Sequence, residues 1–320
     1  MFRPILSQTA VTRAAIRSIA TSAASANAAA PGSDKIVAPV RRLGVIGAGQ
    51  MGIGIAQVAA QVAKIPVTVM DVSMPRLQQQ LAFVDSLLAK NVAKGKMQES
   101  ERKDIVSRFT LTTDIKDFAS ADFVVEAVSE KTDLKLDLFR QLSEVTSKDT
   151  ILASNTSSIS ITKIASVTKN PENVIGVHFM NPVPVMKLVE IISGLQTSPE
   201  TLQRSLALAT AMGKTTATSQ DVPGFIANRL LMPFINEAVF ALQDGLGTRE
   251  DIDATCRLGF SHPMGPLTLA DFIGLDTCLA IMQILHSQLG DSKYRPANLL
   301  VKYVEAGWLG KKSGRGFYKY

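Results

Sequence analysis

Short apolar runs alternate with segments of helical spacing over the first two thirds of the chain. Runs typical of buried strands occupy residues 43–46, 67–71, 109–111, 121–128, 150–155, 174–178, 186–192 and 215–218. Apolar residues at helical spacing lie between them, at 53–63, at 76–107 with a break at 94–96, at 131–146 and at 199–212. This alternation predicts an α/β fold whose doubly wound, mostly parallel sheet is covered by helices on both faces.

The pattern changes after "DVPGF" at 221–225, because no further strand is predicted there. One long helix is indicated by an apolar stripe of Phe225, Leu230, Phe234, Ala238 and Leu242. Further helices are expected at 249–258, 267–289 and 296–306. We therefore expect a leader at 1–33, a sheet domain at 34–220 and an all-helical C-terminal domain at 221–320.

The leader has the composition of a mitochondrial transit peptide. It is rich in Ser, Thr and Ala, contains Arg3, Arg13 and Arg17, and has no acidic residue before Asp34. On a helix the three arginines fall within about 80° of one another. A disordered tail is the alternative, and a secretory signal fits less well because no compact Leu-rich core follows the first arginine. We predict a location in the mitochondrial matrix.

The net charge of +6 does not indicate nucleic-acid binding. Without the three leader arginines it is +3, and no run of five or more Lys or Arg occurs. Residues 43–63 carry no charge and have the length of a membrane span, but they contain five glycines and three glutamines. We therefore expect no integral membrane span, and the glycine motif in this stretch explains it better.

That motif is G-x-G-x-x-G, formed by Gly47, Gly49 and Gly52 between a strand and a helix. Gly47 permits the tight turn, Gly49 lets backbone N–H groups approach a pyrophosphate, and Gly52 lets the helix lie close to the strand. Asp71 ends the next strand, where its carboxylate can accept hydrogen bonds from ribose hydroxyls and repel a 2′-phosphate. The motif in this context predicts dinucleotide binding, with NAD favoured over NADP.

A histidine and a glutamate end two other strand-like runs. In "GVHFMNPVPVMKLVEI", His178 ends one run and Glu190 ends the next, twelve positions later. Ligands bind at the carboxyl ends of strands in open α/β sheets. An imidazole there can act as a general base, and a neighbouring carboxylate can fix its tautomer. We expect a His178–Glu190 dyad beside the nicotinamide, with a core histidine bonded to backbone as the alternative.

Other polar residues end strands or lie at the junction of the two domains. "EAVSEKTDLK" offers Glu130 and Lys135, "SNTSS" offers Ser157, and "PGFIANR" places Asn228 at the start of the helical domain. Ser157 and Asn228 could bind a substrate oxygen or the nicotinamide, and helix capping explains them equally well. No His, Asp or Glu cluster has metal-ligand spacing in this sequence, so we expect no metal.

Together these residues resemble the L-3-hydroxyacyl-CoA dehydrogenase family, from Arg42 to Tyr320. The resemblance is carried by the strings "GVIGAGQMGIGIAQVAA", "VVEAVSEKTDLK", "ASNTSS", "HFMNPVPVMKLVEI", "DVPGFIANR", "HPMGPLTLADFIGLD" and "KKSGRGFYKY". It implies NAD-dependent oxidation of L-3-hydroxyacyl-CoA to 3-oxoacyl-CoA, the third step of fatty-acid β-oxidation. It also implies a Rossmann domain followed by a helical domain that dimerises and contributes to the substrate site.

The resemblance also assigns roles to residues. His178 would be the catalytic base and Glu190 its orienting acid, while Ser157 and Asn228 would complete the catalytic set and contact substrate. The implied NAD contacts are Gly47, Ala48, Gly49, Gln50, Met51, Gly52, Asp71, Glu130, Lys135, Ser157, Asn181 and Lys312. CoA contacts would lie in the helices after Asp71, at Lys94 and Ser86.

Two other functions remain open on the sequence alone. A β-hydroxyacid dehydrogenase acting on free acids would share the domain plan, although such enzymes typically rely on a catalytic lysine. A non-catalytic or moonlighting relative is the second alternative. We also expect a homodimer, because helical domains of this plan usually bury an apolar face against a second copy.

Overall fold

The computed structural model describes residues 38–320, so the predicted leader lies outside the described residues. Eight strands form one sheet in the order β3-β2-β1-β4-β5-β6-β7-β8. Strands β1 to β6 are parallel, β7 runs antiparallel to β6, and β8 is parallel to β7. The strands are β1 Leu43–Ile46, β2 Val67–Met70, β3 Phe109–Thr112, β4 Phe123–Glu126, β5 Ile151–Ser154, β6 Val174–Phe179, β7 Leu188–Ser193 and β8 Thr215–Gln220.

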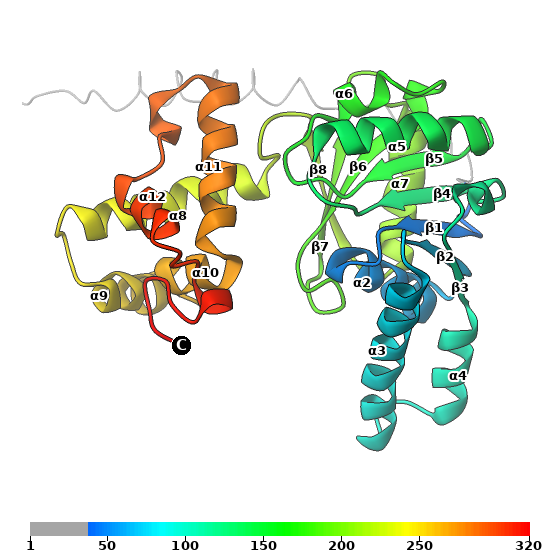
Figure 1. Ribbon diagram of the computed structural model, residues 1–320, viewed down its shortest axis with the longest axis horizontal. Coiled ribbons are helices and arrows are strands. Elements are labelled where there is room, and N and C mark those ends of the chain that lie inside the picture. Colours follow the sequence, from blue (N-terminus) through cyan, green and yellow to red (C-terminus); the bar gives the residue numbers. More distant parts are fainter. Residues whose placement is uncertain (1–37) are drawn as a thin grey trace, which may run out of the picture. The chain divides into compact units, whose positions relative to one another are not determined.

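Helices cover both faces of this sheet (Figure 1). These helices are α2 Gln50–Val58, α3 Met74–Ala93, α4 Glu99–Ser107, α5 Thr132–Val145, α6 Ile161–Ala165 and α7 Pro199–Ala211. Apolar side chains of α2, α3 and α7 share one buried core with the sheet, and those of α5 and α6 share a second core on the other face. Successive strand residues alternate between these cores, as Val124 and Val125 do. The mostly parallel, doubly wound sheet that the sequence predicts is confirmed.

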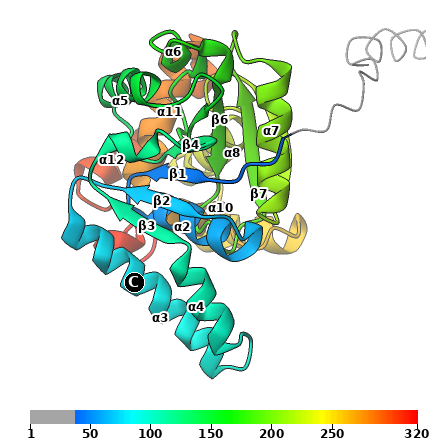
Figure 2. The same ribbon diagram turned by 90° about the vertical axis from the view of Figure 1, so that its right-hand side faces the viewer.

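Helices α3 and α4 pack side by side beyond β2 and β3, as two perpendicular views agree (Figure 2). A chain reversal at residues 94–98 separates them, at the predicted break. Arg102 of α4 joins them because its guanidinium donates hydrogen bonds to both carboxylate oxygens of Asp85 in α3, each at 2.7 Å. This two-helix extension carries Ser86 and Lys94.

The last hundred residues are helical, as the sequence predicts, and enclose a core of their own. The helices are α8 Ala227–Gln243, α9 Arg249–Ala254, α10 Pro266–Ile273, α11 Leu275–Leu289 and α12 Asn298–Glu305. The single helix expected at 267–289 is two helices that meet at 98°. Gly274 separates them with φ = 105°, a conformation that a helix cannot contain and that glycine adopts without strain.

The uncharged stretch at 43–63 is divided among β1, the glycine turn, α2 and a π-helical turn at Ala59–Ala63. Among residues 38–320 no single helix is long and apolar enough to cross a membrane, and only the bent pair α10 and α11 passes on combined length and composition.

Candidate active site

The turn between β1 and α2 has the geometry that a dinucleotide needs. A β-carbon on Gly52 would lie 1.8 Å from the carbonyl oxygen of Gly47, so only glycine fits where the helix meets the turn. Gly47 has φ = 98°, and a β-carbon there would lie 2.6 Å from the Ala127 carbonyl. Gly49 differs, because its β-carbon position has no protein atom nearer than 3.8 Å. The open side of the turn therefore lies at Gly49, before the first turn of α2, where backbone N–H groups lack helical partners.

Asp71 follows β2 and lies against this turn. Its Oδ2 accepts a hydrogen bond from the Ala48 amide at 2.8 Å, which fixes the carboxylate beside the glycine motif. The fit between the turn and a bound dinucleotide is therefore good: the helix N-terminus faces the diphosphate position, and an anchored acid lies where the adenine ribose hydroxyls would come. The sequence predicted both features.

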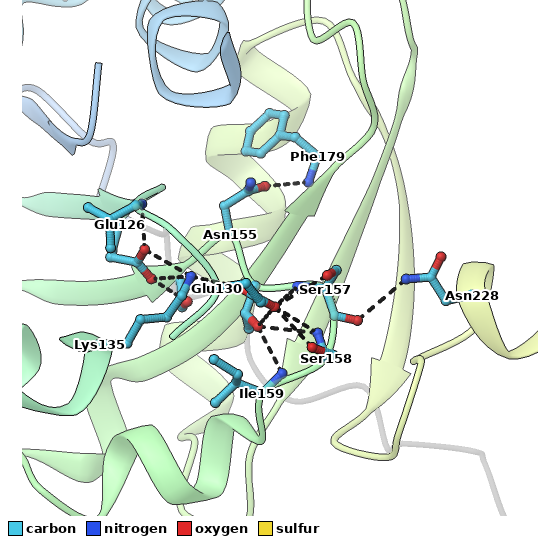
Figure 3. Close-up of polar contacts among 12 residues, drawn as sticks. Glu126, Glu130, Lys135, Asn155, Ser157, Ser158, Ile159, Phe179 and Asn228 are labelled. Atoms are coloured by element: carbon cyan, nitrogen blue, oxygen red, sulfur yellow. Dashed lines mark hydrogen bonds and ion pairs between the residues drawn. The ribbon is translucent and has the colours of Figure 1, made fainter. Parts of the chain in front are cut away.

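A buried ionic network lies at the carboxyl ends of β4 and β5 (Figure 3). Lys135 has no exposed surface, and its Nζ lies 2.9 Å from Glu126 Oε1 and 3.0 Å from Glu130 Oε2. Glu126 is also fully buried, and it accepts further hydrogen bonds from the Ser154 hydroxyl and the Val128 amide. Because Lys135 is enclosed, it supports the site through Glu130 instead of presenting its own charge.

Glu130 carries this network to the loop after β5. Its Oε1 accepts hydrogen bonds from the hydroxyl groups of Thr156, Ser157 and Ser158, and from the amides of Ser157 and Ser158. Burial acts to raise the pKa of Glu130, but Lys135 and the hydrogen bond from Thr156 outweigh it and hold the pKa below its ordinary value. Glu130 is therefore an ionised anchor that fixes the position of Ser157.

The dyad residues face each other across the antiparallel pair of β6 and β7. The sheet register places His178 directly opposite Glu190, so their side chains project from the same face. His178 Nδ1 lies 2.7 Å from Glu190 Oε2. An ionised carboxylate can only accept, so Nδ1 carries the proton and Nε2 of the neutral ring is left as the acceptor.

The second oxygen of Glu190 binds the start of α8. Glu190 Oε1 accepts hydrogen bonds from the amides of Ile226 at 2.9 Å and Ala227 at 2.8 Å. Burial acts to raise the pKa of Glu190, but the hydrogen bonds from His178 and Ala227 lower it below its ordinary value. The glutamate is thus an ionised acceptor for groups on two elements, His178 of β6 and the backbone at the start of α8.

Asn228 and Ser157 also meet at this junction. The Asn228 amide nitrogen donates a long hydrogen bond, 3.4 Å, to the carbonyl oxygen of Ser157, so the Ser157 hydroxyl is left to Glu130. Asn228 lies in the first turn of α8 and is buried. Phe225, just before α8, packs edge-on to the His178 ring with centroids 5.9 Å apart.

The remaining predicted residues are dispersed. Asn181 is exposed in the turn after β6, and Ser86 and Lys94 are exposed on the two-helix extension. Lys312 forms an ion pair with Asp276 of α11, with Nζ 2.6 Å from Oδ1. Neither the exposed positions nor this ion pair tests the predicted roles. The NAD role of Lys312 and the CoA roles of Ser86 and Lys94 therefore stay predictions.

Glu126 and Arg76 are site residues that the sequence reasoning missed. Glu126 is the last residue of an apolar strand, and a single carboxylate there is typical of the point where a strand ends and solvent begins. The structure shows instead that Glu126 is fully buried. Arg76 lies in the first turn of α3, with Nε 3.9 Å from Asp71 Oδ2. Proximity to Asp71 in sequence was the signal that could have found it.

The chain is similar to proteins that are named as 3-hydroxybutyryl-CoA dehydrogenases. The chain is 53% identical over 281 residues to a probable 3-hydroxybutyryl-CoA dehydrogenase of Bacillus subtilis, covering 88% of this chain and 98% of that protein. It is 51% identical over 285 residues to the 3-hydroxybutyryl-CoA dehydrogenase of Bradyrhizobium diazoefficiens, covering 89% and 97%. The crystal structure of the (S)-3-hydroxybutyryl-CoA dehydrogenase of Ralstonia eutropha matches with a TM-score of 0.86 and 46% identity, covering 88% and 99%.

These relatives correct the predicted location. They come from bacteria, as do further relatives from Deinococcus radiodurans, Clostridioides difficile and Mycobacterium tuberculosis. Relatives of bacterial origin give no support for import into mitochondria, so the prediction of a mitochondrial matrix location is wrong. It rested on the Arg, Ser, Thr and Ala content, on the absence of acidic residues before Asp34 and on the spacing of three arginines, and these features are not specific to one kind of leader.

Two family models cover nearly all of residues 42–320. The model of the 3-hydroxyacyl-CoA dehydrogenase NAD binding domain matches residues 42–222. The model of the 3-hydroxyacyl-CoA dehydrogenase C-terminal domain matches residues 224–320. With its glycine turn, its anchored Asp71 and these matches, the chain belongs to the 3-hydroxyacyl-CoA dehydrogenase family of NAD-dependent oxidoreductases.

Proposed function

We propose that this chain oxidises L-3-hydroxyacyl-CoA to 3-oxoacyl-CoA, with the four-carbon 3-hydroxybutyryl-CoA as its preferred substrate. The observation that supports it most is the hydrogen bond between His178 Nδ1 and Glu190 Oε2, which leaves Nε2 free to take a proton. The four-carbon preference follows the names of the relatives, and a place in fatty-acid β-oxidation stays a prediction.

In this proposal the glycine turn and two carboxylates hold NAD. The backbone from Gly47 to Gly52 receives the diphosphate, Asp71 receives the adenine ribose, and Glu130 lies toward the nicotinamide side. When bound, NAD supplies the acceptor for the two electrons and the hydrogen that leave substrate C3. Asn181 and Lys312 belong to the same set as proposed contacts.

His178 then acts as the general base. Its Nε2 takes the proton of the substrate 3-hydroxyl as the C3–O bond becomes a carbonyl, and the ring becomes an imidazolium. Glu190 is a positioning residue: it holds Nδ1–H, fixes the tautomer and stabilises the positive charge that develops. A base of this kind contributes about 10² to 10⁴ in rate.

Ser157 and Asn228 would orient the acyl group. Ser157 is held by Glu130 through both its hydroxyl and its amide, so a substrate oxygen near it meets a group that is already oriented. Asn228 approaches the same loop from α8. Oriented binding of this kind lowers the entropic part of the barrier. Lys94 and Ser86 are proposed contacts for CoA, on the extension formed by α3 and α4.

The free-acid alternative fits less well. It requires a lysine as the base, and Lys135, the lysine predicted at this site, is fully buried between Glu126 and Glu130. Its ammonium is enclosed by protein and by these two carboxylates, so Lys135 does not present its amine to a substrate.

The test is a comparison of substrates with the same enzyme. We expect rapid NADH oxidation with acetoacetyl-CoA, slower oxidation with 3-oxoacyl-CoA of ten or more carbons, and none with free acetoacetate. Equal turnover of free acetoacetate and its CoA ester would refute the proposal, and a higher rate with long chains would refute the four-carbon preference.

We also propose that residues 34–220 form the NAD-binding domain and residues 221–320 a helical domain, and that the helical domain joins two copies as a homodimer. Its exposed large apolar side chains support this, and they include Leu230, Leu246, Leu258, Phe260 and Phe272. Sedimentation equilibrium should give twice the chain mass, and a monomer at micromolar concentration would contradict the dimer.

A further inference from the structure

Arg76 lies between two parts of the dinucleotide site. It belongs to the first turn of α3, where Ser73 caps the helix by accepting a hydrogen bond from the Arg76 amide. Its side chain extends back over the turn between β1 and α2, so Nη2 lies 3.8 Å from the β-carbon position of Gly49. That is the only contact within 4 Å found for Gly49 among residues 38–320, apart from its own chain neighbours. Arg76 therefore faces the open side of the glycine turn.

The same guanidinium flanks Asp71, but loosely. Arg76 Nε lies 3.9 Å from Asp71 Oδ2, an oxygen that already accepts the Ala48 amide at 2.8 Å. The Arg76 side chain is 54% exposed and that of Asp71 only 12%. An exposed pair at this separation contributes little to stability. The Ala48 amide fixes the Asp71 carboxylate, whereas the Arg76 guanidinium is free to turn toward another anion.

A contribution to the fold does not explain Arg76. Positive charge in the first turn of a helix opposes the helix dipole, so an arginine at this place does not stabilise α3. In the described part of the chain its side chain makes no hydrogen bond, and its one ion pair is the loose contact with Asp71. The position of the Arg76 side chain therefore favours a role in ligand binding over a role in stabilising the fold.

We infer that Arg76 is a specificity-determining residue of the adenosine site. Asp71 makes the site prefer NAD over NADP, and Arg76 makes that preference smaller by favouring NADP. Asp71 repels a 2′-phosphate, and Arg76 offsets that repulsion from beside the same carboxylate. A guanidinium can also bind phosphate oxygens with two parallel N–H groups, a geometry that a neutral side chain lacks. NAD and NADP differ only at the ribose 2′ position. An effect of Arg76 at that position therefore changes the ratio of their two dissociation constants.

The experiment measures dissociation constants of NADH and NADPH by cofactor fluorescence, without any acyl-CoA. Its variants are Arg76→Gln, Asp71→Asn and the double variant, with Arg140→Gln as the control. Arg140 is exposed on α5, so its loss removes the same charge from another helix. Because no substrate is present, the outcome is independent of the proposed reaction and its dyad.

We expect Arg76→Gln to weaken NADPH binding about fivefold and NADH binding by less than about twofold, the size of one exposed charge contact. Asp71→Asn should tighten NADPH binding about tenfold with Arg76 present, and by less than about threefold in the double variant. The Asp71→Asn background makes the comparison measurable even where wild-type NADPH binding is weak. The differences should shrink in high salt, and Arg140→Gln should change neither constant.

Two outcomes would overturn the inference. Equal changes in NADH and NADPH binding would assign Arg76 to the shared diphosphate, and unchanged constants in both backgrounds would make it an ordinary surface residue. Melting temperatures of all variants separate these outcomes from misfolding, and Arg76→Gln should melt no lower than wild type.

Discussion

Lys135 gives the clearest case of a single residue whose role depends on burial. Its ammonium is enclosed by Glu126 and Glu130, with Ser154 and the loop after β5 completing the network. Two carboxylates and one ammonium leave a net negative charge, which the surrounding hydroxyl and amide donors offset. The network joins the ends of β4 and β5 and so fixes the loop that carries Ser157.

Removing Lys135 should therefore destabilise the whole fold. In Lys135→Met the buried Glu126 loses the one cation that it pairs with among residues 38–320, and the free energy of unfolding should fall by about 3–5 kcal/mol. The exposed neighbour Lys131 is the matched control, and Lys131→Met should change it by less than about 0.5 kcal/mol. Urea unfolding measures both. Similar stabilities for the two variants would show that the network carries no such energy.

Glu130 makes the stability depend on pH in a defined direction. Its pKa in the folded state is below the ordinary value of 4.5, so the unfolded chain binds its proton more readily. The stabilisation from Glu130 is therefore complete above pH 4.5 and is lost as pH falls through the folded-state pKa. Its side chain is 35% exposed, so the amount is about 1 kcal/mol or less.

The comparison of wild type with Glu130→Gln isolates this effect. The difference in their free energies of unfolding should be constant between pH 5 and 7 and should shrink as pH falls below 4.5. A difference that grows on acidification would mean that the folded-state pKa is raised, contrary to the account.

At the residue scale the sequence predicted motifs better than isolated charges. Asp71 was found because it follows an apolar run after the glycine motif, and Glu190 because it follows His178 by twelve positions at the end of an apolar run, although the structure places Glu190 inside β7. Glu126 was missed because one carboxylate at the end of "FVVE" gives no periodic signal, and its burial depends on α5 packing over β4. Lys312 was assigned by resemblance alone, and its ion pair with Asp276 could not be read from residues so far apart in sequence.

The glycine turn is the element on which the cofactor site depends. Gly52 and Gly49 lie three residues apart, yet their surroundings differ: a β-carbon on Gly52 would collide with Gly47 O at 1.8 Å, and one on Gly49 would meet no protein atom within 3.5 Å. Gly52 allows α2 to pack against the turn, and Gly49 keeps the space beside the turn open.

Alanine at these two positions should therefore separate folding from binding. Gly52→Ala should lower the free energy of unfolding by about 3 kcal/mol or more, because α2 must move away from the turn. Gly49→Ala should keep near-normal stability and weaken NADH binding about tenfold or more, as the methyl group blocks an N–H···phosphate contact. Thermal unfolding and NADH fluorescence measure the two effects. Equal destabilisation by both would contradict this division.

At the element scale the order of strands and helices followed from alternation, but two features did not. The sequence placed one helix over 267–289, since its apolar spacing continues through Gly274; only the φ of 105° in the fold reveals the break. It also suggested that β6 and β7 bring their ends together without giving the register. The pairing of His178 with Glu190 depends on how the turn at 180–187 is built.

At the scale of the whole described chain, Glu190 is where separate parts meet. Its carboxylate binds His178 on β6 and the amides at the start of α8, and Asn228 of α8 reaches the loop after β5. Residues from both matched family regions thus contribute to one site. The sequence could predict these residue types but not this convergence, which requires the complete fold.

The most direct test of the proposed chemistry is the kinetics of His178→Gln with 3-hydroxybutyryl-CoA and NAD. We expect kcat to fall by about 10² to 10⁴, because the proton acceptor is lost. The NADH dissociation constant should stay within about twofold of wild type, since the glycine turn and Asp71 are untouched. A His178→Gln enzyme with near-normal kcat would contradict the assignment of His178 as the base.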